Sequence, residues 1–254
     1  MKHLLFYLAI IIQLSSLSSC VSSKKIIYFN DIEETEINKK IATYEPKIKV
    51  GDIIAINISA IEPEASIPFN LYASPPMKGS APSETLDYLV NADGTILMPI
   101  FGKVAVKDYT VKQLTSLIVG KLSDYIEKPS VYVRLKNFKV SVIGEVRSPG
   151  SFIVENERMT IIEALGLAGD LSINGKRKNV MLIREERGER TFVEIDLTKR
   201  SLFDSKYYYL AQNDIIYVQP NKSKINSAAV GPSISIFISA ISAVIGIIAI
   251  LGII

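Results

Sequence analysis

Cysteine and histidine each occur only once in this chain of 254 residues. Because Cys20 is the single cysteine, no disulfide can form within the chain. The single histidine, His3, lies in a segment that we expect to be removed from the mature protein. The mature chain would then lack the commonest general base and the usual zinc ligands, so we expect no metal site and no cofactor.

The chain also lacks the motifs and the charge pattern of several large functional classes. No GxxxxGK[ST] phosphate loop, GxSxG nucleophile turn or HExxH zinc motif occurs in it. Glu62 and Glu64 stand close together, but they lie in a proline-rich stretch where we expect water to solvate them. The 29 basic and 26 acidic residues are spread along the chain, so nucleic acid is not an expected partner. We therefore predict a protein that is not an enzyme.

The amino-terminal residues have the layout of a secretory signal peptide, which we place at residues 1–19. A short polar start precedes the apolar run 4–14, and small residues follow up to Cys20. That run is shorter than the ~20 residues that span a bilayer. Leu17 and the two serines before Cys20 resemble the lipobox of bacterial lipoproteins. This resemblance implies a membrane-tethering lipid on the Cys20 thiol; the alternative is an incidental cysteine behind an ordinary signal peptide.

The carboxy-terminal end is apolar as well, and no charged residue occurs after position 224. A helix over residues 233–254, rising ~1.5 Å per residue, would cover about the ~30 Å of a hydrocarbon core. We therefore predict a transmembrane helix there. Small residues recur on one face of this helix, namely Ser235, Ser239, Ser242 and Gly246. Such a face lets helices pack closely or line a shared interior, whereas a plain anchor with incidental serines is the alternative.

Between the two apolar ends of the chain, residues 89–104 predict a β-hairpin. Apolar residues lie on both sides of Asp93 and Gly94, and Asp-Gly between two such runs is a strong signal for a tight β-hairpin. Pro99 cannot donate a ladder hydrogen bond, so we expect it at an edge or a bulge. Gly102 nearby allows a bend or a close approach of another backbone.

The segments before this hairpin are of three kinds. Residues 20–44 are polar and predict a tether whose charges are solvated. Residues 53–58 alternate as a strand does. Residues 60–83 are rich in proline and predict a long loop, in which Phe69 and Tyr72 either contact a ligand or a neighbouring subunit or simply pin the loop.

A helix follows the hairpin. Thr110 and Gln113 form a capping box, and apolar residues of 111–125 repeat at helical spacing until Pro129 ends the pattern. Residues 131–135 then predict a strand.

A similar order of elements recurs further along the chain. Residues 101–104, Phe-Gly-Lys-Val, are echoed by residues 143–146, Ile-Gly-Glu-Val, and each set precedes a predicted helix. In the second copy Thr160 and Glu163 form the capping box, and residues 161–168 carry the apolar stripe. Two small β-plus-helix modules are therefore predicted.

A second echo pairs the turn at Asp52 with the turn at Asp214, because each leads directly into a predicted strand. Further strands are predicted at residues 180–184 and 191–195. The adjacent tyrosines at 207–209 look like a sugar-stacking platform, but at most two of them can share one face of a strand, so we expect a core role for at least one. Since strands flank a single helix in each module, the predicted fold class is α+β.

Taken in order, these motifs resemble the bacterial outer-membrane polysaccharide export lipoproteins, with an export-type domain followed by one SLBB (soluble ligand-binding β-grasp) domain. The residues that carry the resemblance are Cys20, 50–54 with Asp52, 88–90, 93–96 with Asp93 and Gly94, Pro99, 102–104 with Gly102, 129–131, 142–146 with Gly144, Pro149, Gly150, and 213–218 with Asp214.

The resemblance implies a domain plan and a set of partners. The implied plan is a lipidated tether at 20–44, an export-type domain at 45–137, an SLBB domain at 138–222 and the membrane helix at 233–254. It also implies a ring-shaped homo-oligomer that conducts an exported polysaccharide, with the soluble domains in the periplasm and the lipid at Cys20 in the outer membrane. An inner-membrane chain-length regulator or tyrosine autokinase is the implied partner.

The family's pore helix is amphipathic, whereas the tail of this chain offers only serines and glycine on its polar side. A pore-lining helix and a single-helix anchor in either membrane therefore both stay open. Our leading prediction is passive export without bond chemistry. The alternatives are a membrane-anchored glycan-binding or envelope adaptor that forms no pore and, third, an enzyme that hydrolyses glycans.

Overall fold

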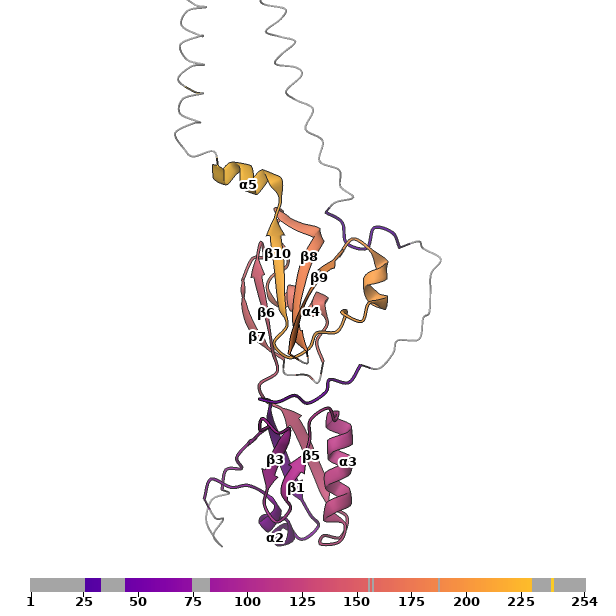
Figure 1. Ribbon diagram of the computed structural model, residues 1–254, viewed down its shortest axis with the longest axis vertical. Coiled ribbons are helices and arrows are strands. Elements are labelled where there is room, and N and C mark those ends of the chain that lie inside the picture. The colour runs from indigo at the N-terminus through magenta and orange to yellow at the C-terminus, as the bar shows by residue number, and fades with distance from the viewer. Residues whose placement is uncertain are drawn as a thin grey trace, which may run out of the picture.

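The computed structural model shows two bodies stacked along the long axis of the molecule (Figure 1). Each has its own hydrophobic core, one formed within residues 44–135 and the other within 138–220, and we call these the first body and the second body. Both combine small helices with β-sheet, so the predicted α+β class is confirmed. The structure describes residues 26–32, 44–74, 83–154, 156, 158–186, 188–229 and 239.

The first body consists of a three-stranded sheet in the order β2-β1-β5, a separate hairpin and one long helix. Its elements are β1 (Ile53–Ser59), α2 (Pro63–Ser66), the 3-10 helix η2 (Ile67–Phe69), β2 (Tyr88–Leu89), β3 (Thr95–Met98), β4 (Gly102–Ala105), α3 (Val111–Leu122) and β5 (Ser130–Leu135). The central strand β1 buries every second side chain and pairs antiparallel with both neighbours. The strands predicted at 53–58 and 131–135 are thereby confirmed.

Helix α3 begins as its sequence predicts. The Thr110 side chain accepts from the Gln113 N–H at 3.2 Å, and the Gln113 side chain accepts from the Thr110 N–H at 2.9 Å, which is the expected capping box. The helix ends at Leu122, earlier than the predicted stop at Pro129. Beyond it the Ile126 N–H still donates to the Leu122 oxygen at 2.8 Å, and the Ile126 side chain is buried in the core of the first body.

The tight turn at Asp93-Gly94 is present, but the predicted hairpin across it is wrong. The Asn91 N–H donates to the Thr95 oxygen at 2.9 Å, and Gly94 has a φ of +78°. Beyond that pair the arms separate, since β2 pairs with β1 whereas β3 pairs with β4. Only Gly94 in this turn takes a positive φ, so the turn differs from the type I′ turn of a two-residue hairpin.

The actual hairpin turns at Pro99, between β3 and β4. Pro99 therefore lies just beyond the end of a strand, where its missing N–H costs no ladder hydrogen bond. Gly102 opens β4 with a φ of +66°.

The prediction that residues 60–83 form a long loop is wrong for the first part of that stretch. Residues 63–69 form α2 and η2, and the Phe69 side chain is buried in the core of the first body. The buried Asn70 side chain accepts from the Ile58 N–H at 2.9 Å and donates to the Ile58 oxygen at 2.8 Å. An amide side chain thus takes the place of a neighbouring strand at the end of β1.

The second body contains a five-stranded sheet in the order β7-β6-β10-β8-β9. Its elements are β6 (Lys139–Gly144), β7 (Gly150–Ile153), α4 (Ile161–Leu167), β8 (Gly175–Glu186), β9 (Glu189–Ile195), the 3-10 helix η3 (Arg200–Asp204), β10 (Ile215–Pro220) and α5 (Lys222–Ala229). β10 runs parallel to β6 and antiparallel to β8. The capping box of α4, Thr160 with Glu163, and the strands predicted at 180–184 and 191–195 are confirmed.

The two similar segments, 101–104 and 143–146, do not occupy equivalent positions in the two bodies. Gly102 opens β4 with open space beside it, whereas Gly144 closes β6 directly against the backbone of β10. The two glycines share a positive φ for different reasons, one for a turn and the other for close contact between two strands.

Part of the expected tether packs against the second body. The Phe29 and Asn30 N–H groups donate to the oxygens of Leu197 and Thr198 at 3.3 and 3.0 Å. The Tyr28 hydroxyl donates to Asp170. We call residues 26–32 the strap; it joins the second body before the chain reaches the first (Figure 1).

Among the residues that the structure describes, no helix is both long enough and apolar enough to cross a bilayer. The predicted signal peptide, Cys20 and nearly all of the predicted helix 233–254 lie outside the described residues. Of the small-residue face, only Ser239 is described, and it is helical and exposed.

Gly144→Ala should destabilise the second body strongly. With φ at +93°, an added Cβ would lie 2.1 Å from the Val218 oxygen on β10, so the two strands must move apart. We expect a loss of about 2–4 kcal/mol in the free energy of unfolding, measured by urea denaturation with circular dichroism. Gly120→Ala in α3 meets nothing within 4 Å and is the control, with an expected change of at most ~1 kcal/mol. Equal losses in both variants would contradict the strand contact.

Candidate functional site at the junction of the two bodies

Asn137 connects the two bodies through both its side chain and its main chain. Its side-chain oxygen accepts from the Ile53 N–H at 2.9 Å, and its side-chain nitrogen donates to the Gly51 oxygen at 3.1 Å. Its main-chain oxygen accepts from the Gln212 side chain at 2.6 Å, and the Gln212 side-chain oxygen accepts from the Lys139 N–H at 2.9 Å. One residue thus bonds to the start of β1 in the first body and to the turn before β10 in the second.

The two turns that meet at Asn137 have the same internal structure. The Asp52 carboxylate accepts from the Lys49 N–H at 2.8 Å, and the Asp214 carboxylate accepts from the Ala211 N–H at 2.8 Å. Each aspartate is buried, and the residue before it, Gly51 or Asn213, has a positive φ. The predicted echo between these two turns is confirmed.

The likeness extends to the helix caps. In the first body the Ile48 N–H donates to the Tyr109 oxygen at 2.9 Å, and in the second the Leu210 N–H donates to the Met159 oxygen at 2.8 Å. Tyr109 and Met159 each precede the capping threonine of α3 or α4. The two bodies therefore share one arrangement of turn, strand and capped helix, although the helix follows the turn in the first body and precedes it in the second.

Arg184 distinguishes the second turn from the first. Its guanidinium contacts the Asp214 carboxylate at 3.0 Å through Nε and at 2.6 Å through Nη2, which also donates to the Tyr209 oxygen at 3.0 Å. The side chains of Arg184 and Asp214 are 11% and 0% exposed. Burial opposes the charge of Arg184, but the hydrogen bond to Asp214 and its negative charge raise the pKa of Arg184 on balance. Among the described residues Asp52 forms no ion pair with an arginine, and burial raises its pKa.

The tyrosines beside this ion pair are already in contact with other side chains. Tyr44 stacks on Tyr209 with centroids 4.9 Å apart, and the Arg158 guanidinium lies 5.4 Å from the centre of the same Tyr209 ring. Arg184 lies 5.3 Å from the centre of the Tyr207 ring. Tyr207 and Tyr208 also pack against the core of the second body, as predicted for at least one of the three. Tyr209 thus contacts Tyr44 at the junction, whereas Tyr207 and Tyr208 pack within the second body.

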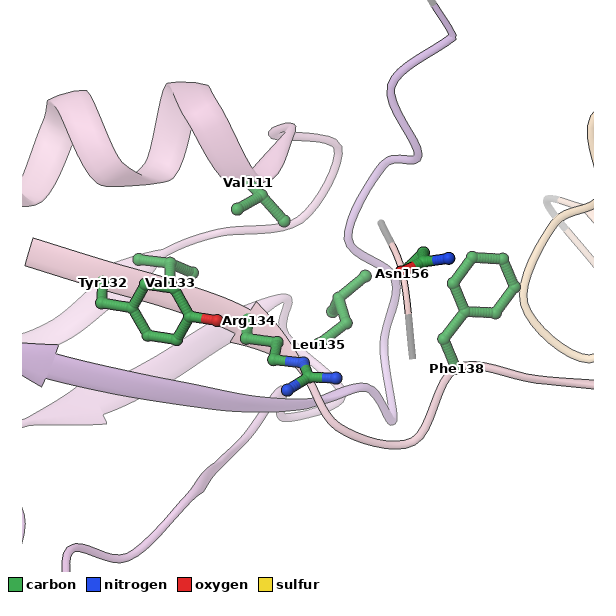
Figure 2. Close-up of a pocket in the computed structure, with 7 residues that line it drawn as sticks. All are labelled: Val111, Tyr132, Val133, Arg134, Leu135, Phe138 and Asn156. Atoms are coloured by element: carbon green, nitrogen blue, oxygen red, sulfur yellow. The ribbon is translucent and has the colours of Figure 1, made fainter. Parts of the chain in front are cut away.

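A cavity of about 300 Å³ opens beside the junction (Figure 2). Residues 132–135 of β5 line one side, Val111 at the start of α3 lies above them, and Phe138 and Asn156 of the second body lie at the other end. Its lining includes a single arginine and no paired acid and base. Within the described part of the chain, no group of three or more His, Cys, Asp or Glu residues is placed to hold a metal ion.

The remaining residues singled out from the sequence lie away from the junction or have structural roles. Asp93 accepts from the Thr95 side chain at 2.7 Å and from Lys103 at 3.0 Å, and these bonds lower the pKa of Asp93 to about 2. Pro149 immediately precedes β7, which begins at Gly150.

Sequence reasoning missed Asn137, Tyr44 and Arg184. A signal for Arg184 exists, because it continues the period-two face of Val180 and Leu182 and so falls at a buried position of a strand. A charge at such a position predicts a buried counter-charge. No comparable local signal exists for the other two residues, whose contacts span large sequence separations.

Asp52→Asn and Asp214→Asn should have different effects on stability. Because the pKa of Asp52 is raised, the folded protein holds that proton more tightly than the unfolded chain, and stability falls as the pH rises through the folded-state pKa. The amide introduced at position 52 keeps an acceptor without the charge, so at pH 7 the melting temperature should stay equal or rise, and the difference should shrink towards pH 4. Asp214→Asn leaves Arg184 buried without its counter-charge and should cost about 3–5 kcal/mol. Circular dichroism melts from pH 4 to 8 measure both; equal losses at pH 7 would contradict this account.

Comparison with known proteins places the two bodies in known families. Residues 40–136 match the family model for polysaccharide biosynthesis/export protein, and residues 138–218 match the SLBB domain. The two matches meet at Asn137, the residue that connects the bodies.

Two curated relatives illustrate the similarity. The EPS I polysaccharide export outer membrane protein EpsA of Ralstonia solanacearum is 25% identical over 203 residues, which are 75% of this chain and 52% of that protein. The capsule polysaccharide export outer membrane protein CtrA of Neisseria meningitidis is 28% identical over 142 residues, which are 54% of this chain and 36% of that protein. The chain thus spans about half or less of the length of these relatives.

The order of the two matches, an export model followed by an SLBB domain, is the one expected from the sequence motifs. The family is one of export proteins and not of enzymes, which confirms the prediction that the chain is not an enzyme. The first body of this chain belongs to the polysaccharide biosynthesis/export protein family, and the second body is an SLBB domain.

Proposed function

We propose that this protein is a passive conduit for a capsular or extracellular polysaccharide across the periplasm and the outer membrane. The observation that supports this proposal is the architecture, in which an export-family body is joined to an SLBB body. The described residues at the junction form hydrogen bonds between the bodies, and none of the described residues forms a metal-binding group. The polysaccharide is a substrate that passes through and is not changed chemically. The proposed domains are the export-type domain at 45–137 and the SLBB domain at 138–222.

The places where the chain enters and leaves the second body support one orientation. The strap and helix α5 both lie at the end of the second body that is far from the first (Figure 1). Ile26, where the strap begins, follows Cys20 after a short stretch whose reach is at most about 20 Å. A lipid on Cys20 and a membrane helix at 233–254 would therefore hold the same end of the molecule against the outer membrane. The first body would then point into the periplasm, towards an inner-membrane chain-length regulator or tyrosine autokinase.

Ring formation completes the proposal, because one copy cannot enclose a path for a polymer. Copies arranged around an axis along the molecule would bring their carboxy-terminal helices together in the membrane. The small face of Ser235, Ser239, Ser242 and Gly246 suits close packing of such helices. If the lumen continues through the membrane layer, these helices line the pore; if it stops there, they only anchor the ring.

Deletion of the gene should abolish the surface polysaccharide. If the protein is the conduit, the polymer is still synthesised but cannot leave, so surface staining with a polysaccharide-specific lectin or antibody should be lost while intracellular polymer remains. A deletion strain with normal surface polysaccharide, in a background without a second copy of the gene, would contradict the proposal.

Complementation separates the conduit from an adaptor and tests the anchor. The wild-type gene should restore staining, and metabolic labelling with a fatty-acid analogue should mark the wild-type protein but not Cys20→Ser. Cys20→Ser should restore export poorly because the second body is then held only by the carboxy-terminal helix. A wild-type protein that binds glycan yet stays monomeric in mild detergent would favour the adaptor.

A further inference from the structure

The end of the second body that is far from the first is formed by three segments that bond to one another. β6 and β10 run parallel and end there, whereas β8 runs antiparallel to β10 and begins there. The Asn221 N–H, just before α5, donates to the Asn174 oxygen, just before β8, at 2.7 Å. The Ser172 N–H donates to the Glu145 oxygen, just after β6, at 2.9 Å. We call the exposed residues of 145–149, 170–176 and 222–229 the end surface.

The end surface exposes large apolar side chains on two of its segments. Ile173 is 67% exposed in the loop before β8, and Ile225 is 50% exposed on α5. The strap, which also reaches this end (Figure 1), adds Ile27, which is 53% exposed. Single exposed apolar residues are common on protein surfaces, so the meaning of these isoleucines depends on what surrounds them.

Basic side chains surround the isoleucines. Arg147, Lys222 and Lys224 are exposed, and no carboxylate of the described residues forms an ion pair with any of them. Lys176 is half-buried and donates to the Gln219 side chain at 3.2 Å. All four are long side chains that can pack their stems beside apolar groups while the charge stays at the surface.

The acidic side chains at this end are fewer and are hydrogen-bonded. Glu145 accepts from a serine hydroxyl at 2.7 Å, and Asp170 accepts from the hydroxyl of Tyr28 in the strap. Asp31, further along the strap, pairs with Lys199 at 3.9 Å. The end surface thus carries four basic residues and two acidic ones, so its net charge is positive.

Helix α5 combines the apolar and the basic features in one element. It lies across the long axis of the molecule (Figure 1), so it would lie in the plane of a bilayer that meets this end. Ile225 comes three residues after Lys222, a spacing that makes the two side chains neighbours on the helix surface. Apolar and cationic side chains on a helix in the interface plane are typical of helices that bind membrane surfaces. Beyond α5, residues 230–254 contain no charged residue, so the chain continues from this surface as an apolar sequence.

We propose that the end surface binds the anionic phospholipid headgroups of the bilayer to which the chain is anchored. Arg147, Lys222 and Lys224 contact the phosphate-bearing headgroups, and Ile173 and Ile225 insert at the boundary with the acyl chains. The isoleucines favour a lipid surface over a hydrated acidic polysaccharide, which offers no apolar layer. This inference rests on the proposed orientation of the molecule, and it adds a dependence on lipid charge that anchoring alone does not produce.

A single tryptophan tests whether the end surface meets the headgroups. The chain contains no tryptophan, so one introduced indole reports the position of its own residue. Full-length Ile173→Trp is placed in nanodiscs whose lipids carry a spin label on the headgroup. Its fluorescence should be quenched more strongly in equal parts of phosphatidylglycerol and phosphatidylcholine than in phosphatidylcholine alone, and high salt should remove the excess because it screens the charges. Leu97→Trp, which is 64% exposed on the first body, is the positional control and should stay unquenched in both.

Charge reversal separates binding from nearness that the anchors impose. Adding Lys222→Glu and Lys224→Glu to Ile173→Trp should lower the ratio of docked to undocked protein about tenfold or more, so that quenching in the anionic discs falls to its level in phosphatidylcholine. Acidic residues in the first turn favour a helix, so α5 should stay folded, which circular dichroism checks. Lys107→Glu with Lys112→Glu, both exposed on the first body, changes the net charge equally and should keep the excess quenching.

The outcomes separate this inference from the proposed function. Equal quenching of Ile173→Trp in both lipids, with Leu97→Trp unquenched, would overturn headgroup binding and leave the proposed orientation intact. Quenching of Leu97→Trp instead of Ile173→Trp would overturn the orientation and this inference with it. If the emission of Ile173→Trp responds to a soluble polyuronate but not to phosphatidylglycerol, the end surface binds an acidic polymer and the lipid proposal is wrong.

Discussion

The arrangement of the two bodies depends on two turns, each closed by a buried aspartate, that both bond to one asparagine. Asp52 and Asp214 close equivalent turns at the starts of β1 and β10, the strands around which the two sheets are built, and Asn137 bonds to both turns. Burying a carboxylate is costly unless its charge is matched or removed. The second body matches it with Arg184, whereas in the first body burial raises the pKa of Asp52. The cost of burying the carboxylate is therefore offset by an ion pair in the second body and not in the first, and the alignment of the bodies follows from where the turns lie.

What could be predicted from the sequence is local, and what could not is long-range. The capping boxes at Thr110 and Thr160 need only residues three apart, and the alternation in β1 and β5 is visible within each strand. The turn at Gly94 was also predictable, but the partner of each arm was not, because β2 pairs with β1, which lies far earlier in the chain. Phe69 lies in the core although the prolines around it predicted a loop. Those prolines stand near the starts of α2 and η2, where a helix accommodates proline. At the junction, Tyr44 and Tyr209 are far apart in sequence, and no periodic pattern links them.

The charged and aromatic residues at the junction are engaged with one another: Arg184 with Asp214, Tyr44 with Tyr209 and Arg158 with Tyr209. Of these three contacts, the stacking of Tyr44 on Tyr209 joins the two bodies, and the other two lie within the second body. The strap and α5 both lie at the end of the second body that is far from the first, so the two proposed anchors would hold the first body away from the membrane.

Single-particle electron microscopy of the full-length protein in detergent tests the central claim most directly. The account predicts a closed ring with a central lumen and two stacked layers, in which the layer of second bodies touches the detergent belt and the layer of first bodies is farthest from it. A particle that is monomeric, that lacks a lumen, or that carries its detergent belt beside the first bodies would contradict the account.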